Sequence, residues 1–149
     1  MDEVIIVPTM QNSWKEEKVL DINKRVDIIW EYIKELPINL YKKVYRDLIE
    51  AQLIPPYYSY ATLHALKTKY CNDEVFVLCG EDTMKDIPNW MHGGQIIKDY
   101  NFLIVDRFSW DISSTQIREY IRLDKDISKF VSSNVINLLK KYYKSPNSD

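Results

Sequence analysis

The strongest chemical signal in the sequence is a run of hydroxyl side chains at the start of a predicted helix. Ser113, Ser114 and Thr115 open an expected helix over residues 115–123, and Arg118 follows one turn later. Hydroxyls and the unpaired N–H groups of a helix start bind anions, and the helix dipole favours negative charge there. The guanidinium of Arg118 suits phosphate oxygens. The pattern predicts a phosphate site, although an ordinary N-cap run would use the same residue types.

A second candidate group follows an apolar strand. Gly80, Glu81 and Asp82 come directly after a predicted strand over residues 74–79, and Trp90 follows eight residues after Asp82. In open α/β sheets, ligands bind beyond the carboxyl ends of the strands, which makes this segment a candidate site. Two plainer interpretations stay open: Asp82 as a turn or cap residue, and Trp90 as part of the core.

These groups have to be positioned by elements that alternate between strands and helices. Strands are expected over residues 3–8, 74–79 and 101–106, with weaker candidates at 40–45 and 110–112. Helices are expected after Asn23 and over residues 59–70, 94–100, 115–123 and 134–143, with Asn23 and Ser133 as candidate caps. The strand at 74–79 is apolar on both faces, as strands covered by helices on both sides tend to be. The alternation predicts an α/β fold with a mostly parallel sheet and helices on both faces, in a single domain over 1–149 with a polar tail at 144–149.

Composition narrows the function classes. The chain has 149 residues and a net charge of -2, without a concentrated basic block, which argues against a nucleic acid polymer as partner. Its apolar runs are too short for a membrane helix, and no signal-peptide pattern is visible. Cys71 and Cys79 lack metal-ligand spacing and suit a reducing compartment. We therefore expect a cytoplasmic protein that does not bind membranes.

The segment Ile112-Ser113-Ser114-Thr115-Gln116-Ile117-Arg118 resembles the ISSTxIR motif of the nicotinate- and nicotinamide-nucleotide adenylyltransferases, within the HxGH nucleotidyltransferase superfamily. Gly80-Glu81-Asp82 resembles the family's Gly-x-Asp after a core strand, and Trp90 lies close to the family's tryptophan. Further matches in order along the chain are Val7-Pro8, Lys15, Arg25, Tyr60, Thr62, Arg107 and the closing segment 126–131. The resemblance covers nearly the whole chain and implies a Rossmann-like fold.

The resemblance also implies roles for individual residues. Binding of ATP would fall to Ser113, Ser114, Thr115 and Arg118, together with Gly80 and Asp82. Binding of the mononucleotide would fall to Trp90, stacked on its pyridine ring, and to Thr62 and Arg107; Lys15 would be a phosphate contact with a candidate catalytic role. The reaction would transfer an adenylyl group from ATP to a pyridine mononucleotide, with release of pyrophosphate. Mg²⁺ would bridge phosphate oxygens, so no protein metal motif is expected. A homo-oligomer is compatible with this assignment.

The chain departs from the family in its first motif. The family begins with a strand that leads into a His-x-Gly-His segment, whose histidines stabilise charge on the reacting phosphates. No such segment occurs here, and the only histidines are His64 and His92, both expected at the surface. The chain starts at what looks like the family's second strand. Without the first strand, its neighbours must close up or leave backbone groups unpaired.

Three other interpretations remain open. One is a non-catalytic nucleotide-binding remnant of the family. Another is a different transferase of the superfamily, such as a cytidylyltransferase or a phosphopantetheine adenylyltransferase, which Trp90 after Gly-x-Asp disfavours. A helical interaction protein fits poorly, because the strand over residues 74–79 has no helical period. Side-chain identity leaves open whether nicotinate or nicotinamide mononucleotide is the acceptor.

Overall fold

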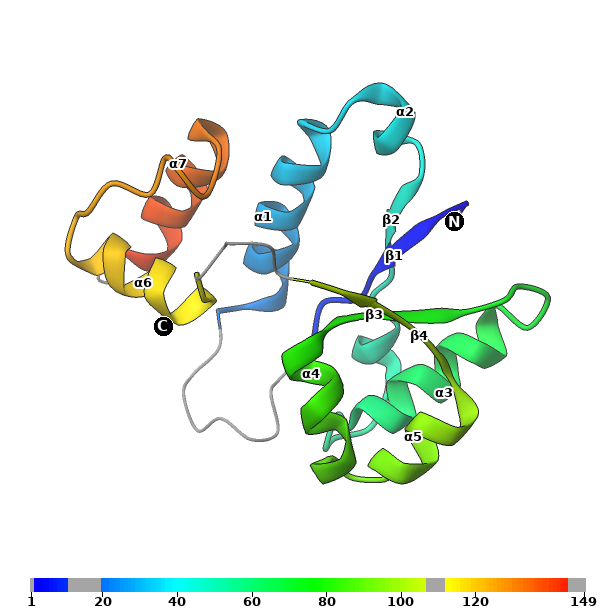
Figure 1. Ribbon diagram of the computed structural model, residues 1–149. Helices are drawn as coiled ribbons and strands as arrows, with labels where there is room; N and C mark the ends of the chain where they lie inside the picture. Colours follow the sequence, from blue (N-terminus) through cyan, green and yellow to red (C-terminus); the bar gives the residue numbers. More distant parts are fainter. Residues whose placement is uncertain (1, 11–19, 107–111, 145–149) are drawn as a thin grey trace. The chain divides into compact units, whose positions relative to one another are not determined.

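The computed structural model describes residues 2–10, 20–106 and 112–144 (Figure 1). Lys15, Arg107 and most of the candidate strand at 110–112 lie outside these residues, as does nearly all of the polar tail. The chain divides into two compact units, one formed by Met1–Leu48 with Ile112–Asp149 and the other by Ile49–Asp111. Each unit is described below by itself, and the single domain remains a prediction.

The first unit contains a pair of short parallel strands. β1 (Val4–Ile6) pairs with β2 (Val44–Arg46) in a parallel register in which Val4 faces Val44. The backbone N–H of Asp47 donates to the carbonyl of Ile6 at 2.9 Å and extends this ladder by one bond. The strand expected over residues 40–45 is therefore displaced toward the C-terminus. The cause lies at Pro37, which precedes a short helix α2 (Ile38–Tyr41) that occupies the first residues of the expected strand.

Three helices of the first unit share a core. They are α1 (Ile22–Lys34), α6 (Ser114–Arg122) and α7 (Ser133–Tyr143), and α7 contacts both of the others. Buried side chains from α6, α7 and the segment between them form the cluster: Ile121, Ile127, Val135 and Leu139. Ile28 of α1 packs against it. Burying each of these aliphatic side chains contributes about 1.5–3 kcal/mol to folding.

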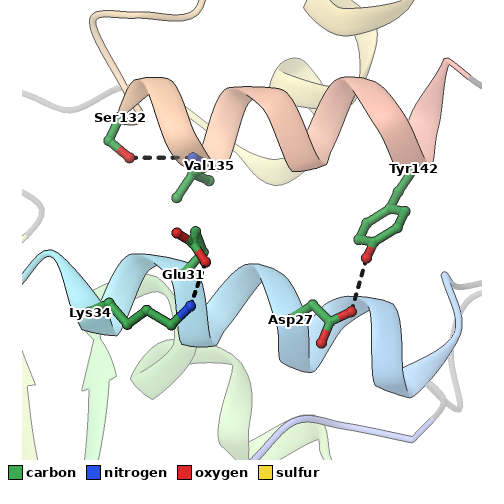
Figure 2. A network of polar contacts seen from close by, with 6 residues as sticks. All are labelled: Asp27, Glu31, Lys34, Ser132, Val135 and Tyr142. Carbon is green, nitrogen blue, oxygen red and sulfur yellow. Dashed lines mark hydrogen bonds and ion pairs between the residues drawn. The ribbon is translucent and has the colours of Figure 1, made fainter.

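Side chains just before the helices fix where α1 and α7 begin. Asp21 caps α1 by accepting from the N–H of Asn23 at 2.9 Å, so the prediction that Asn23 itself is the cap was wrong. Ser132 rather than Ser133 caps α7, because its hydroxyl accepts from the N–H of Val135 (Figure 2). Both helices begin earlier than the predicted caps implied, α1 at Ile22 and α7 at Ser133.

A hydrogen bond joins α1 and α7 across 115 positions of the sequence. The Tyr142 hydroxyl donates to the carboxylate of Asp27 at 2.9 Å (Figure 2). This bond raises the pKa of Tyr142 above its ordinary value, because the bond is lost when the phenol ionises and the phenolate would face a carboxylate.

The second unit holds the other pair of strands, β3 (Phe76–Gly80) and β4 (Asn101–Val105). They are parallel and in a continuous five-residue register from Phe76–Asn101 to Gly80–Val105. The remaining elements of this unit are η1 (Ile49–Gln52), α3 (Ser59–Lys69), α4 (Glu81–Asp86), η2 (Ile87–Asn89) and α5 (Gly93–Asp99). The strands predicted over 74–79 and 101–106 are therefore confirmed within two residues of their ends.

Only one face of the β3–β4 pair is packed by described residues of its unit. Val77 and Phe102 are register partners and contact the buried cluster of Ile87, Ile96 and Tyr100. On the opposite face, Leu78 and Leu103 are 51% and 37% exposed. The apolar pattern of residues 74–79 predicted that helices cover both faces of the strand. Hydrophobicity reports the tendency of a side chain to be buried, but it does not identify the residues that cover it.

The expected class of fold is confirmed as a mixed α/β structure with parallel strands. Among the described residues, the strands form two separate two-stranded sheets, β1–β2 and β3–β4. No described helix has the length and the apolar composition required to cross a membrane.

Candidate functional site

The start of α6 is a cluster of exposed hydroxyls held by a capping box. The Ser113 hydroxyl accepts from the N–H of Gln116 at 3.2 Å, and the Gln116 side chain accepts from the N–H of Ser113 at 2.7 Å. Ser113, Ser114 and Thr115 are all exposed. A helix leaves its first N–H groups without intrahelical acceptors, so those of Ser114 and Thr115 point outward. Because the Ser113 oxygen already accepts a bond, its own O–H is available to donate to an anion.

Arg118 reaches back toward this cluster, as its spacing predicted. Its Nη2 donates to Thr115 Oγ1 at 3.1 Å, and the side chain is half-buried. Thr115 is therefore an acceptor for Arg118 and keeps its own O–H as a donor. The start of α6 thus presents hydroxyl, backbone and guanidinium donors together, an arrangement that suits a phosphate group.

Gly80 and Asp82 lie in the second unit, where β3 turns directly into α4. Gly80 ends the strand and is the N-cap residue of α4, and Asp82 stands exposed in the first turn of that helix. Burial raises the pKa of the Cys79 thiol, and the nearby Asp82 carboxylate raises it further. The carboxylate therefore lies at the C-terminal end of β3, the position predicted from the sequence.

A shallow depression of about 460 Å³ runs along α4 to Trp90. Its lining residues are Asp82, Thr83, Lys85, Asp86 and Trp90. The indole N–H of Trp90 donates to Asp86 Oδ2 at 3.0 Å, while the ring is half-buried against the second unit's core. Lys85 Nζ lies 3.5 Å from Glu81 Oε2. Both side chains of this ion pair are exposed, so the pair contributes little to stability.

The turn that carries Trp90 depends on a close backbone approach at Gly93. A Cβ added at Gly93 would stand 1.9 Å from the carbonyl oxygen of Ile87, whereas one at Gly94 would meet nothing within 4 Å. The N–H of Gly93 donates to the Trp90 carbonyl at 2.9 Å, and that of Trp90 donates to Ile87 at 2.9 Å. Gly93 is therefore required where it stands, because no side chain fits between the start of α5 and η2.

Of the other predicted site residues, Thr62 is buried, and Lys15 and Arg107 lie outside the described residues. Thr62 is 7% exposed, and its hydroxyl donates to Glu50 Oε1 at 2.9 Å. Its predicted contact with a mononucleotide remains untested, as do the phosphate roles of Lys15 and Arg107, which lie outside the described residues. Glu50 gave no signal in the sequence, because its partner is twelve residues away and its burial is tertiary.

Both histidines are exposed, as expected, and both lie beside the same tyrosine. The Tyr60 ring centroid is 6.4 Å from that of His64 and 5.0 Å from that of His92. His92 precedes α5 with a φ of 59°, a left-handed conformation that leads into Gly93. Neither histidine lines the depression beside Trp90.

The sequence interpretation missed Asp86 and Lys85, although their spacing carried a signal. Asp82, Asp86 and Trp90 recur at steps of four residues, which places successive side chains on one face of a helix. That pattern could have predicted that the three line one surface. Among the described residues, no group of three or more His, Cys, Asp or Glu side chains could hold a metal ion.

Comparison with known proteins gives one consistent answer. No family model matches the chain. A protein of Fusobacterium nucleatum described as a nicotinate-nucleotide adenylyltransferase is 28% identical over 167 residues, covering 96% of this chain and 84% of its own length. The nicotinate-nucleotide adenylyltransferase of Bacillus subtilis is 25% identical over 159 residues, covering 95% and 79%. The chain is similar along nearly its whole length to proteins described as nicotinate-nucleotide adenylyltransferases.

Two solved structures of similarly described proteins share the fold of this chain. A Vibrio parahaemolyticus protein described as a nicotinate-nucleotide adenylyltransferase superposes with a TM-score of 0.75 at 23% identity, covering 93% of this chain and 81% of that one. Plasmodium falciparum nicotinic acid mononucleotide adenylyltransferase, solved in complex with NaAD, superposes with a TM-score of 0.74 at 16% identity, covering 95% and 82%. The Rossmann-like fold implied by the sequence resemblance is thereby confirmed.

Proposed function

We propose that this chain catalyses transfer of the adenylyl group of ATP to nicotinate mononucleotide, with release of pyrophosphate, as a step in NAD biosynthesis. The observation that carries the proposal is the donor cluster at the start of α6, where Ser113, Ser114, Thr115 and Arg118 meet. The names of the homologues supply the reaction and favour nicotinate over nicotinamide mononucleotide as the acceptor.

In this reaction, an oxygen of the mononucleotide phosphate attacks the α-phosphorus of ATP. A new P–O bond forms, the bond from the α-phosphorus to the oxygen bridging to the β-phosphorus breaks, and pyrophosphate leaves with that oxygen. Such transfers depend on positioning and on stabilising charge at the phosphates. The chain's part is to supply donors: hydroxyl and backbone groups at the start of α6, with the Arg118 guanidinium.

The acceptor and the nucleoside would be held by the second group of residues. Gly80, the N-cap residue of α4, would line the nucleotide site, Asp82 would accept from a ribose hydroxyl, and Trp90 would stack on the pyridine ring. The mononucleotide would also contact Thr62 and Arg107, and a phosphate would contact Lys15, which has a candidate catalytic role. Mg²⁺ would arrive on the ATP phosphates, an arrangement that asks for few protein ligands. A cytoplasmic location and self-association into a homo-oligomer belong to the same proposal.

The test is an assay of the chain with ATP, Mg²⁺ and nicotinate mononucleotide. Formation of the dinucleotide and release of pyrophosphate are measured together, and ATP binding is measured separately by calorimetry. Arg118→Gln should weaken ATP binding about tenfold, because a charge-assisted hydrogen bond to a phosphate is lost. Arg122→Gln is the matched control, since Arg122 is exposed in the last turn of the same helix and should leave ATP affinity unchanged.

A second candidate is nucleotide binding without turnover, which needs only the donor cluster at the start of α6 and no His-x-Gly-His segment. Under this alternative, calorimetry detects ATP binding that is sensitive to Arg118→Gln, while no pyrophosphate appears. A chain carrying a family-type His-x-Gly-His strand at its N-terminus should then gain turnover. Failure of ATP to bind under any of these conditions would refute both candidates.

A further inference from the structure

Two tryptophans each line a depression among the described residues, and the charged groups beside the two indole rings have opposite signs. In the first unit, the guanidinium of Arg46 lies 4.9 Å from the centroid of the Trp30 ring, so that ring already carries a cation on its face. In the second unit, Trp90 has a carboxylate at its indole N–H, the 3.0 Å bond to Asp86. No Lys or Arg of the described residues is stacked on the Trp90 ring.

We propose that Asp86 is a positioning residue that holds the Trp90 indole as a platform for a cationic heteroaromatic ring, the pyridinium of a mononucleotide. The inference rests on the function proposed above and adds to it a residue and a basis for selectivity. Asp86 acts in two ways: its oxygen fixes the plane of the indole, and its charge favours a positive ring over a neutral one.

The fixing of the plane follows from where Asp86 and Trp90 stand. Asp86 is the last residue of α4, and Trp90 follows the single turn of η2. The buried Ile87 and the tight contact at Gly93 hold the backbone of this turn. The indole could still rotate about its side-chain bonds, and the bond from its N–H to Asp86 selects one orientation.

The selectivity follows from electrostatics. The face of an indole attracts cations through its quadrupole, and a hydrogen bond from its N–H to an anion makes the ring richer in electrons. The carboxylates of Asp82 and Asp86 border the same depression and add attraction for a positive ring, partly offset by the ammonium of Lys85. A pyridinium should therefore bind here better than an uncharged ring of the same size and shape.

A matched pair of probes tests this inference: nicotinate mononucleotide, whose ring is cationic, and its 1,4-dihydro form, whose ring is neutral. Dissociation constants for both are measured by calorimetry on the full chain. The wild type should prefer the cationic form by about two- to fivefold, the size of a cation–π contact at an exposed site. Asp86→Asn keeps an oxygen that can accept from the indole but removes the charge, so the preference should fall to about one while the neutral form binds as before.

Two further variants distinguish a role of Asp86 in positioning the indole from a nonspecific loss of binding. Asp86→Ala removes the acceptor as well and should weaken binding of both forms, with broader near-UV circular dichroism from a less fixed indole. Asp99→Asn is the control. Asp99, like Asp86, accepts a side-chain hydrogen bond from a residue four positions away, in this case Gln95, but Asp99 does not line the depression. This variant should leave both affinities and their ratio unchanged.

Each result has a defined meaning. A preference for the cationic form that survives Asp86→Asn would overturn the role of Asp86 while leaving the adenylyl-transfer proposal intact, provided the ATP assay still responds to Arg118→Gln. Failure of the wild type to bind either mononucleotide would refute this inference and the proposed acceptor together. Loss of the preference in Asp86→Asn, with Asp99→Asn unchanged, is the expected outcome.

Discussion

The two candidate binding regions are built on different principles. At the start of α6, the bonds that shape the region run between residues at most three positions apart: Ser113 with Gln116, and Thr115 with Arg118. The depression beside Trp90 depends on contacts between separate elements, above all the approach of Gly93 to Ile87 and the packing of α5 under η2. A locally built region should tolerate changes elsewhere, whereas the depression should fail when a distant contact fails.

The largest effect is expected at Gly93. Gly93→Ala places a methyl group 1.9 Å from a backbone oxygen, so the turn must move; we expect a loss of about 3 kcal/mol or more in the free energy of unfolding, with loss of mononucleotide binding. Gly94→Ala, with open space around it, should be neutral or slightly stabilising. Urea unfolding of both variants measures the difference. Equal stability of the two would show that the close approach is not a real constraint.

Next in size are the fully buried isoleucines under each region. Ile96 and Ile121 are both 0% exposed, and each change to Ala should cost about 2–5 kcal/mol through lost burial and a cavity. Ile97→Ala and Leu123→Ala, at exposed positions beside them, should cost far less. The comparison predicts that Ile96→Ala impairs mononucleotide binding, whereas Ile121→Ala leaves ATP binding at the locally built start of α6 largely intact. If both variants reduced both affinities equally, the two regions would not be independently supported.

A smaller effect is expected from the cap itself. Ser113→Ala removes the acceptor for the N–H of Gln116 and should cost about 1 kcal/mol of stability. It should also weaken ATP binding, since one donor at the start of α6 disappears. Ser113→Asn can replace the cap and should restore stability, while Ser114→Ala should leave stability unchanged. Thermal unfolding and calorimetry with ATP report the two effects separately.

The smallest effect concerns the bond that ties α1 to α7 in the unit that carries α6. The pKa of Tyr142 is raised above its ordinary value of 10.0, so its contribution to stability is fully present below pH 10 and is lost as the pH rises through the folded-state pKa. Tyr142→Phe should therefore be slightly less stable than the wild type at pH 8, and the two should converge at higher pH. Asp27→Asn gives an independent check of the same bond. A difference that grew with pH would contradict this assignment.

Much of the fold could be predicted from the sequence because its signals are local. The apolar runs located β3 and β4 within two residues of their ends, and the hydroxyl run located the start of α6 within one. The cap residues of α1 and α7 were misplaced by one or two positions, since Asp, Asn and Ser all serve as caps and neighbours compete for the role. Local chemistry thus fixed the elements more firmly than their boundaries.

Other features could not be predicted because they join residues far apart in the chain. Thr62 and Glu50 form a buried pair across twelve positions, and Tyr142 reaches Asp27 across 115. The sequence also could not predict that Leu78 is 51% exposed, because its strand is apolar on both faces. Hydrophobic pattern gives the tendency of a side chain to leave water, and only the assembled elements decide which neighbour satisfies it.

The sequence by itself determined the order of strands and helices, the run of donor side chains at residues 113–118 and the likeness to nicotinate-nucleotide adenylyltransferases. Each of these follows from residue types at short spacing, where the chain's own geometry sets the outcome. The tertiary structure alone decided that Gly93 must have no side chain and that Val77 and Phe102 pack against the buried cluster of Ile87, Ile96 and Tyr100. It also decided that Asp86 bonds to the Trp90 indole. Those outcomes depend on which surfaces meet after folding, and short-range spacing does not encode that information.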